Sequence, residues 1–157
     1  MKSGAVLSPL HVTTRLPSVA ARLVDAGAHG AVVTSRVNVR WLTGFTGSAG
    51  TVIVGAEAGT PMVLVTDGRY AEQAARETAS ARADVLVVER RSYTEVRAAI
   101  ATHMASMVGP KATWAIETDD ISLADYEALV QPVTRPVRSC RARESSMRHR
   151  FWATCVA

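Results

Sequence analysis

The chain has 157 residues, of which 48% are hydrophobic and 20% are charged. This balance suits a single globular domain with its own core and excludes an intrinsically disordered chain. Only 5% of the residues are aromatic, so the core must be built mainly from Ala, Val and Leu. No apolar run approaches the roughly 20 residues of a membrane-spanning helix, and residues 1–10 do not form a secretory signal. We therefore expect a cytoplasmic protein that makes no membrane contact.

The formal net charge of +4 comes from the C-terminal end of the chain. Residues 1–134 hold 12 Lys or Arg against 13 Asp or Glu, whereas residues 135–157 hold six Arg against Glu144 alone. A nucleic-acid-binding domain would be expected to spread positive charge over a folded face. We therefore expect no nucleic-acid partner, with an RNA- or DNA-binding tail as the open alternative. The composition predicts a domain at 1–134 and an Arg-rich tail at 135–157, either disordered or irregular.

Apolar periodicity predicts helices and strands in alternation. In chain order these are helix 16–24, strand 31–33, helix 37–43, strand 51–54, strand 62–65, helix 68–78, strand 85–88, helix 93–107, strand 113–116 and helix 123–130. Pro17 suits the first turn of the first helix, and Gly27 suits its end. The link at 55–61 is too short for a parallel crossover and predicts an antiparallel hairpin. The expected fold is α/β, with a mixed, mostly buried sheet that has helices on its faces.

Residues 44–50, Gly-Phe-Thr-Gly-Ser-Ala-Gly, form a glycine-rich loop between a helix and a strand. A dinucleotide-binding loop needs Gly-x-Gly-x-x-Gly between a strand and a helix, so that the helix N-terminus faces the phosphate. Here a strand follows, and the lysine of a P-loop is missing. Ser48 does not fit a nucleophile elbow because position 46 is Thr. The loop is best interpreted as a sharp turn that lets two segments approach closely.

The titratable residues do not assemble a self-contained active site by any pattern we recognise. None of the four histidines pairs at i, i+4 around a Glu, so a helical zinc site is unsupported. Asp119 and Asp120 stand between a strand and a helix, where helix capping explains them. Asp67 before Gly68 is a turn residue, and Arg69 needs no role beyond that of a solvated side chain. We expect no catalytic residue, metal ligand or cofactor in this chain.

Two motifs carry a family resemblance. They are Asn-Val-Arg-Trp-Leu-Thr-Gly-Phe-Thr-Gly-Ser at 38–48 and Thr-Asp-Gly-Arg-Tyr at 66–70, with Gln73-Ala74 just after them. With this spacing, residues 15–134 resemble the creatinase-like N-terminal domain of Xaa-Pro aminopeptidases and Xaa-Pro dipeptidases. The resemblance implies a mixed sheet flanked by helices that packs against a pita-bread catalytic domain and helps to form a dimer.

The resemblance also implies a role for the loop after the Gly-Phe pair. In relatives this loop approaches the active site of the partner subunit and restricts substrate size. By position, the substrate-gating candidates in this chain are Phe45, Thr46, Gly47 and Ser48. Arg69 is a further candidate for the rim of the partner subunit's active site. Phe45 has a second interpretation, as a core residue.

The resemblance places the chemistry of the family in a second domain. There, two divalent metal ions are held by two Asp, one His and two Glu, and we expect no counterpart of these ligands in this chain. Relatives continue with a strand and a segment rich in Leu, Arg, Lys and Asp, whereas residues 137–157 turn to Arg, Ser, Cys, His and Trp. We hypothesise a truncation or a frameshift near residues 136–140, which makes the tail an out-of-frame product.

The expected function is that of a non-catalytic N-terminal domain for oligomerisation and substrate gating, not that of an enzyme. Its expected partner is a second copy or a pita-bread catalytic domain. The alternative is a stand-alone protein-binding module that keeps the fold without peptidase activity.

Overall fold

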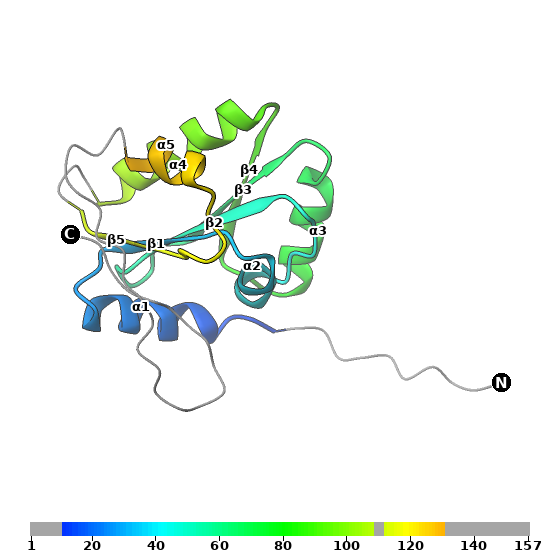
Figure 1. Ribbon diagram of the computed structural model, residues 1–157. Helices are drawn as coiled ribbons and strands as arrows, with labels where there is room; N and C mark the ends of the chain where they lie inside the picture. The colour runs from blue at the N-terminus through cyan, green and yellow to red at the C-terminus, as the bar shows by residue number, and fades with distance from the viewer. Residues whose placement is uncertain (1–10, 109–111, 131–157) are drawn as a thin grey trace.

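The computed structural model describes residues 11–108 and 112–130. In this part of the chain a mixed five-stranded sheet lies between two groups of helices (Figure 1). In chain order the elements are α1 (Arg15–Asp25), β1 (Gly30–Val33), α2 (Arg36–Thr43), β2 (Gly50–Gly55), β3 (Met62–Asp67), α3 (Ala71–Ser80), β4 (Val85–Arg90), α4 (Tyr93–Val108), β5 (Trp114–Ile116) and α5 (Leu123–Val130). The predicted α/β fold with a mixed sheet is confirmed, whereas the predicted tail at 135–157 lies outside the described residues.

The sheet has the strand order β4-β3-β2-β1-β5. β2 runs antiparallel to both of its neighbours, which confirms the predicted hairpin, and the β3–β4 and β1–β5 pairs are parallel. The carboxyl ends of β1, β3, β4 and β5 therefore meet the amino end of β2 at one end of the sheet. The loops that leave these strand ends carry both motifs of the sequence analysis.

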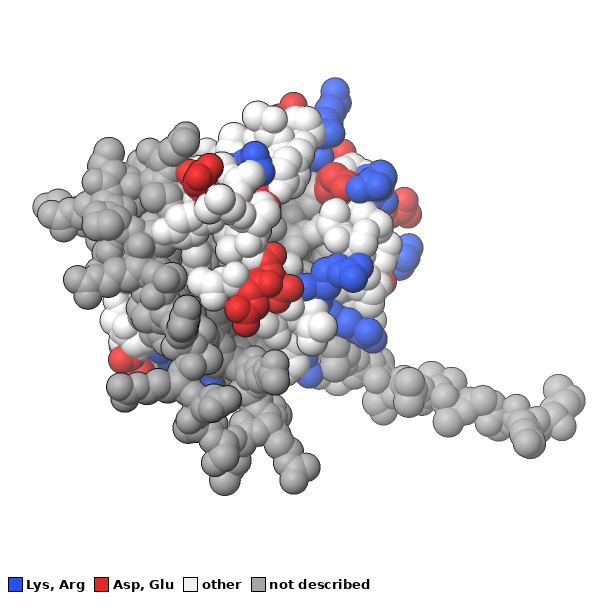
Figure 2. Space-filling view, in the orientation of Figure 1, with Lys and Arg blue, Asp and Glu red and all other residues white. Residues whose placement is uncertain are grey.

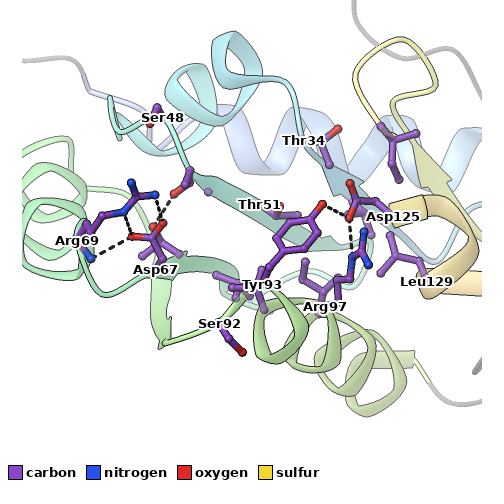
Figure 3. Close-up of a pocket in the computed structure, with 18 of the residues that line it drawn as sticks. Thr34, Ser48, Thr51, Asp67, Arg69, Ser92, Tyr93, Arg97, Asp125 and Leu129 are labelled. Atoms are coloured by element: carbon purple, nitrogen blue, oxygen red, sulfur yellow. Dashed lines mark hydrogen bonds and ion pairs between the residues drawn. The ribbon is translucent and has the colours of Figure 1, made fainter. Parts of the chain in front are cut away.

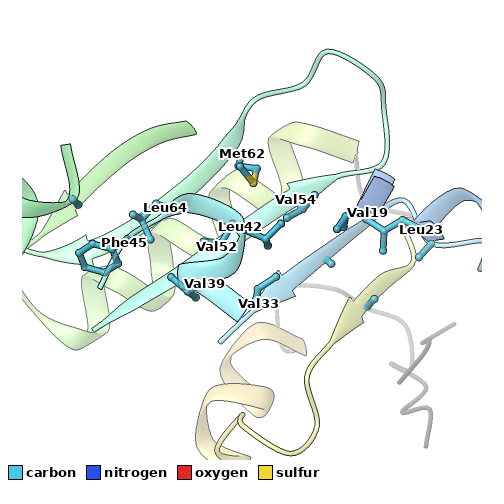
Figure 4. Packing of buried hydrophobic residues seen from close by; sticks show 14 residues of the cluster. Val19, Leu23, Val33, Val39, Leu42, Phe45, Val52, Val54, Met62 and Leu64 are labelled. Carbon is cyan, nitrogen blue, oxygen red and sulfur yellow. The ribbon is translucent and has the colours of Figure 1, made fainter. Parts of the chain in front are cut away.

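Each face of the sheet supports its own core, because successive side chains of a strand point to opposite faces. On one face α1, α2 and α3 pack over the strands, and Figure 4 shows this cluster, which includes Leu42, Val52 and Leu64. On the other face α4 and α5 cover a second cluster that includes Ile53 and Ile100. Helices on both faces explain why the strands are nearly continuous runs of Val, Ile and Leu.

The N-terminal ends of α3 and α5 differ from the prediction, α3 in its position by three residues and α5 in its capping. α3 begins at Ala71 rather than at residue 68, because Asp67 first closes a turn in which its side chain accepts a hydrogen bond from Arg69 N (3.0 Å). The second difference concerns the capping of α5, which was assigned to Asp119 and Asp120. That assignment is wrong, since the hydroxyl of Ser122 accepts the bond from Asp125 N (3.1 Å).

The carboxylate of Glu117 ties the end of β5 to the start of α2. It accepts hydrogen bonds from the backbone N–H groups of Thr34 (2.7 Å) and Ser35 (2.6 Å), and from the side-chain amide of Asn38. Ser35 is the N-cap of α2 but makes no capping bond with its own side chain. Glu117 thus supplies a cap from a distant segment, with its negative charge at the favourable end of the helix. Asn38, the first residue of the larger motif, is the helix residue that completes this contact.

We expect Glu117→Ala to lower the free energy of unfolding by about 1–3 kcal/mol, because it leaves half-buried donors without an acceptor. Denaturant unfolding followed by circular dichroism measures the change. Asp119→Ala is the matched control, since Asp119 is an exposed acid two residues further along the same loop. Equal stability of the two variants would show that the Glu117 contacts contribute nothing.

Candidate functional site

The glycine loop leaves α2 through a left-handed residue. Gly44 has φ +80° and closes the helix with a hydrogen bond from its N–H to Arg40 O (2.8 Å). The hydroxyl of Thr43 donates to Val39 O (2.7 Å) and accepts from Phe45 N (3.1 Å). The chain therefore reverses within two residues, in a conformation that favours glycine at position 44.

Phe45 is the internal anchor of the loop. Its side chain is 1% exposed and meets the ring of Tyr70 edge-on, with ring centroids 6.0 Å apart. A methyl group on Gly47 would overlap the Phe45 ring, and one on Gly50 would lie 2.8 Å from it. The loop wraps around the phenyl ring, and of the two interpretations of Phe45 the structure shows the core one. The predicted close approach of two segments is the packing of this loop on Phe45.

Two exposed side chains of the loop are fixed by hydrogen bonds to α3 and its first turn. Thr46 donates through both its backbone N–H (2.7 Å) and its hydroxyl (2.8 Å) to the carboxylate of Glu77. Gln73 donates to the hydroxyl of Thr46 (3.0 Å) and to Glu77 (3.1 Å). The hydroxyl of Ser48 lies 2.7 Å from that of Tyr70. The loop is therefore held in one shape by partners inside this chain.

We expect Gly47→Ala to destabilise the domain by about 1–3 kcal/mol, because the added methyl group overpacks a rigid aromatic contact. Thermal unfolding measures the loss. Gly68→Ala is the control, because its methyl group would meet only a flexible carboxylate tip, that of Glu89 at 2.8 Å. A Gly47→Ala protein as stable as Gly68→Ala would show that the loop is not packed on Phe45 as described.

Asp67 and Arg69 form an ion pair beside the glycine loop. Their side chains make an ion pair of 2.7 Å, and the hydrogen bond from Arg69 lowers the pKa of Asp67. The Arg69 guanidinium also lies 5.4 Å from the centre of the Tyr70 ring. Arg69 is thus more than a solvated side chain, although 75% of it remains exposed. It stands at the end of the sheet that carries Thr46 and Ser48.

A pocket of about 890 Å³ opens between these loops and the helices α4 and α5 (Figure 3). Its volume lies in the range of small-molecule sites. Apolar strand residues line it together with polar residues from two sides: Ser48, Asp67 and Arg69 on one, and Tyr93, Arg97 and Asp125 on the other. Of the gating candidates, the structure brings Ser48 and Arg69 to this pocket, whereas Phe45 lies in the core and Thr46 faces α3.

Asp125 joins α5 to α4 at the far side of the pocket. It accepts hydrogen bonds from Tyr93, from Ser122 and from Arg97 Nε (2.8 Å), and the Arg97 guanidinium lies 4.2 Å from the centre of the Tyr93 ring. Burial acts to raise the pKa of Asp125, but the bonds from Ser122, Tyr93 and Arg97 outweigh it and hold the pKa below its ordinary value of 3.8. The charged carboxylate is therefore the form that holds the two helices together.

The Asp125 contacts predict a pH-dependent difference in stability. Because the folded-state pKa is the lower one, this carboxylate stabilises the fold above about pH 4 and loses that contribution as the pH falls further. The stability gap between wild type and Asp125→Asn should be largest near pH 7 and shrink toward pH 3 in urea unfolding. Glu127→Gln, an exposed change on the same helix, should show no such gap. A gap that stays constant with pH would contradict the assignment.

The described residues carry no other recognisable site chemistry. Within 11–108 and 112–130, no group of three or more His, Cys, Asp or Glu is arranged to hold a metal ion. No helix in these ranges is long and apolar enough to cross a membrane. The same ranges hold ten Arg and no Lys against 13 Asp or Glu, and Figure 2 shows both signs interspersed on one face.

Comparison with known proteins decides the family. The sequence profile of the creatinase/prolidase N-terminal domain matches residues 15–143, which is most of the chain and continues past α5. The chain belongs to this family. Domains of the family are known from solved structures of bacterial peptidases. The resemblance that the two motifs indicated is thereby confirmed.

Three relatives show the extent of the likeness. The N-terminal domain of the cytoplasmic peptidase PepQ from Mycobacterium tuberculosis H37Rv is 28% identical, with a TM-score of 0.63 over 76% of this chain and 84% of that chain. The Xaa-Pro dipeptidase from Bacillus anthracis shares the fold at 19% identity, with a TM-score of 0.65 over 79% of this chain and 32% of that one. An uncharacterized peptidase, YqhT, from Bacillus subtilis (strain 168) is 48% identical over 48 residues, 31% of this chain and 13% of the peptidase. The chain thus covers a third or less of the last two.

Several site residues were missed by the sequence analysis, namely Tyr93, Arg97 and Asp125 at the pocket and the two acids Glu77 and Glu117. Glu77 fixes Thr46 from within an Ala-rich helix, and Glu117 caps α2 from the end of β5, the strand next to β1. Neither acid stands in a motif, and each finds its partner at a distance of more than 30 residues along the chain. Gln73 had a signal, because it belongs to the family pattern, and its hydrogen bond to Thr46 now explains its place there.

Proposed function

We propose that this chain acts as the non-catalytic N-terminal domain of an Xaa-Pro aminopeptidase or dipeptidase and that it limits which peptides reach a catalytic centre. The observation that carries the proposal concerns one end of the sheet. There, the glycine loop is fixed by hydrogen bonds, and beside it lies the exposed side chain of Arg69, paired with Asp67. Membership of the creatinase/prolidase N-terminal domain family supports it. A cytoplasmic location is part of the proposal, in line with the description of the PepQ relative.

In this proposal the chain supplies shape rather than chemistry. Ser48 and Arg69 present exposed groups on a backbone that Phe45, Tyr70 and Glu77 hold in place. A rigid surface of this kind discriminates substrates by steric exclusion, because a peptide that is too long clashes with the fixed loop. The two divalent metal ions of the family would supply an activated water from the catalytic domain. The described residues offer no group of three or more His, Cys, Asp or Glu that could hold such ions.

The alternative function is that of a stand-alone protein-binding module. The pocket favours it, because its volume of about 890 Å³ and its lining of apolar residues with a few polar groups suit a bound ligand. A module of this kind would bind its partner without any catalytic domain, whereas a gating domain would change the selectivity of one. The two functions therefore differ in what a substitution at the rim does.

A chimera tests the gating role. Residues 1–134 replace the N-terminal domain of the Bacillus anthracis dipeptidase, and hydrolysis of Xaa-Pro dipeptides is compared with that of longer Xaa-Pro peptides. We expect Arg69→Ala to raise kcat/KM for the longer peptides about tenfold relative to the dipeptides, because it removes bulk from the rim. Arg76→Ala, an exposed arginine on α3 outside the pocket lining, is the matched control.

The isolated chain completes the experiment. Without a catalytic domain it should release no N-terminal residue from Xaa-Pro peptides, even with added manganese. If Arg69→Ala leaves the selectivity of an active chimera between longer peptides and dipeptides unchanged, the result would contradict gating and favour the binding module. Sustained metal-dependent turnover by the isolated chain, free of host peptidases, would contradict the non-catalytic role.

A further inference from the structure

The pocket at the end of the sheet holds one charge of each sign that has no partner among the described residues. Its lining contains three arginines and three aspartates, so its formal charge is zero. Two of the arginines form ion pairs with two of the aspartates, on opposite sides of the pocket (Figure 3). The remaining two, Arg91 and Asp120, are exposed, and neither makes an ion pair within the described ranges. A ligand that carries both charges would pair with both side chains.

These two side chains come from opposite edges of the sheet. Arg91 directly follows β4, and Asp120 lies between β5 and α5. β4 and β5 are the first and last strands of the sheet, and five strands spaced about 4.8 Å apart put them about 19 Å from each other. The pocket therefore extends across the carboxyl ends of the parallel strands, the place where open α/β sheets bind ligands.

The wall between the two charges is mostly apolar. Val65, Val96 and Ile121 are among the branched aliphatic residues of the lining. Thr34 also lines the pocket, and its Oγ1 is buried with no hydrogen-bond partner in the described part of the chain. A buried hydroxyl group without a partner costs free energy, which a ligand that bonds to it would restore. The wall therefore suits a ligand with aliphatic side chains and a polar backbone.

The distance between the charges sets the length of the ligand. An extended peptide of three or four residues spans about 10–14 Å. The side chains of Arg91 and Asp120 cover the rest of the distance between the two edge strands. A single amino acid is too short to reach both. A purely anionic ligand would be repelled at Asp120, and a purely cationic one at Arg91.

We propose that this pocket binds a short free peptide with aliphatic side chains, its terminal ammonium group at Asp120 and its terminal carboxylate at Arg91. The peptide backbone supplies the hydrogen-bond partner that the hydroxyl of Thr34 lacks. The volume of about 890 Å³ accommodates a ligand of this size. The inference does not depend on the proposed gating function, because it concerns binding by the isolated chain without a catalytic domain.

Blocked peptides test the assignment of the two peptide termini. Titration of the nitrogen-15-labelled full chain with trileucine, followed by NMR, gives the dissociation constant. We expect N-acetyl-trileucine and trileucine amide each to bind about fivefold more weakly, because each loses one ion pair with an exposed side chain. Free leucine should bind more weakly still. The proposal is overturned if trileucine does not bind at millimolar concentration, or if the blocked peptides bind as tightly as the free one.

Variants with one charge removed locate the termini in the pocket. Arg91→Gln should weaken the binding of trileucine about fivefold and leave that of trileucine amide unchanged. Asp120→Asn should weaken trileucine to the same extent and leave N-acetyl-trileucine unchanged. The adjacent Arg90→Gln and Asp119→Asn remove the same charges outside the lining, so both should bind like the wild type. A loss of affinity that is equal for free and blocked peptides would contradict the assignment.

Thr34→Val tests the hydroxyl group separately. Because Oγ1 has no partner in the described structure, the variant should melt at the wild-type temperature or above it. It should nevertheless bind trileucine about fivefold more weakly, because the bond to the peptide backbone is lost. If the Thr34, Arg91 and Asp120 variants all bind trileucine as tightly as the wild type, the pocket is not the binding site and the proposal fails.

Discussion

The carboxylate of Glu117 is the contact on which the arrangement of the site depends. It joins the end of β5 to the end of β1 and the first turn of α2, and β5 reaches these two consecutive segments only through the parallel β1–β5 pair. The direction of α2 is set at this point, and α2 delivers the glycine loop eight residues later. The contacts of this single half-buried acid thus fix the position of the surface loop relative to the sheet.

At its other end, the loop is fixed by packing rather than by charge. Phe45 occupies the interior of the turn, and the absence of side chains at Gly47 and Gly50 lets the backbone close over the ring. The hydrogen bonds of Thr46 to Glu77 then join the outer surface of the turn to α3. The internal contact orders the backbone, and the external contact orders the exposed groups.

The sequence predicted every element of the described domain, because strands with two covered faces and amphipathic helices leave clear apolar periods. It misplaced the start of α3, because residues 67–70 form a separate turn, closed by hydrogen bonds from Arg69 N to the side chain of Asp67 and from Tyr70 N to Asp67 O, before the helix begins. It assigned the capping of α5 to Asp119 and Asp120, when Ser122 has the correct spacing from Asp125. The strand order and the partners of Glu77 and Glu117 were not predictable, since they depend on pairs of residues that meet only after the sheet has formed.

The family motif of 38–48 mixes residues with different physical tasks. Asn38 binds Glu117, Trp41 lies under the guanidinium of Arg15 at 4.9 Å, and Gly44 ends the helix. Only Thr46 and Ser48 present polar side chains at the surface of the loop itself. Most of a motif that indicates a function is therefore the support of that function, and the exposed part is small.

The internal anchoring of the loop has a thermodynamic consequence for any molecule that docks on it. A flexible loop loses backbone conformational entropy when it binds, at about 1–2 kcal/mol for each residue that becomes ordered. The turn at 44–50 has already lost that freedom during folding, through bonds that do not involve a ligand. Docking at Ser48 would therefore be opposed mainly by desolvation, and its affinity would report contact chemistry rather than the ordering of the chain.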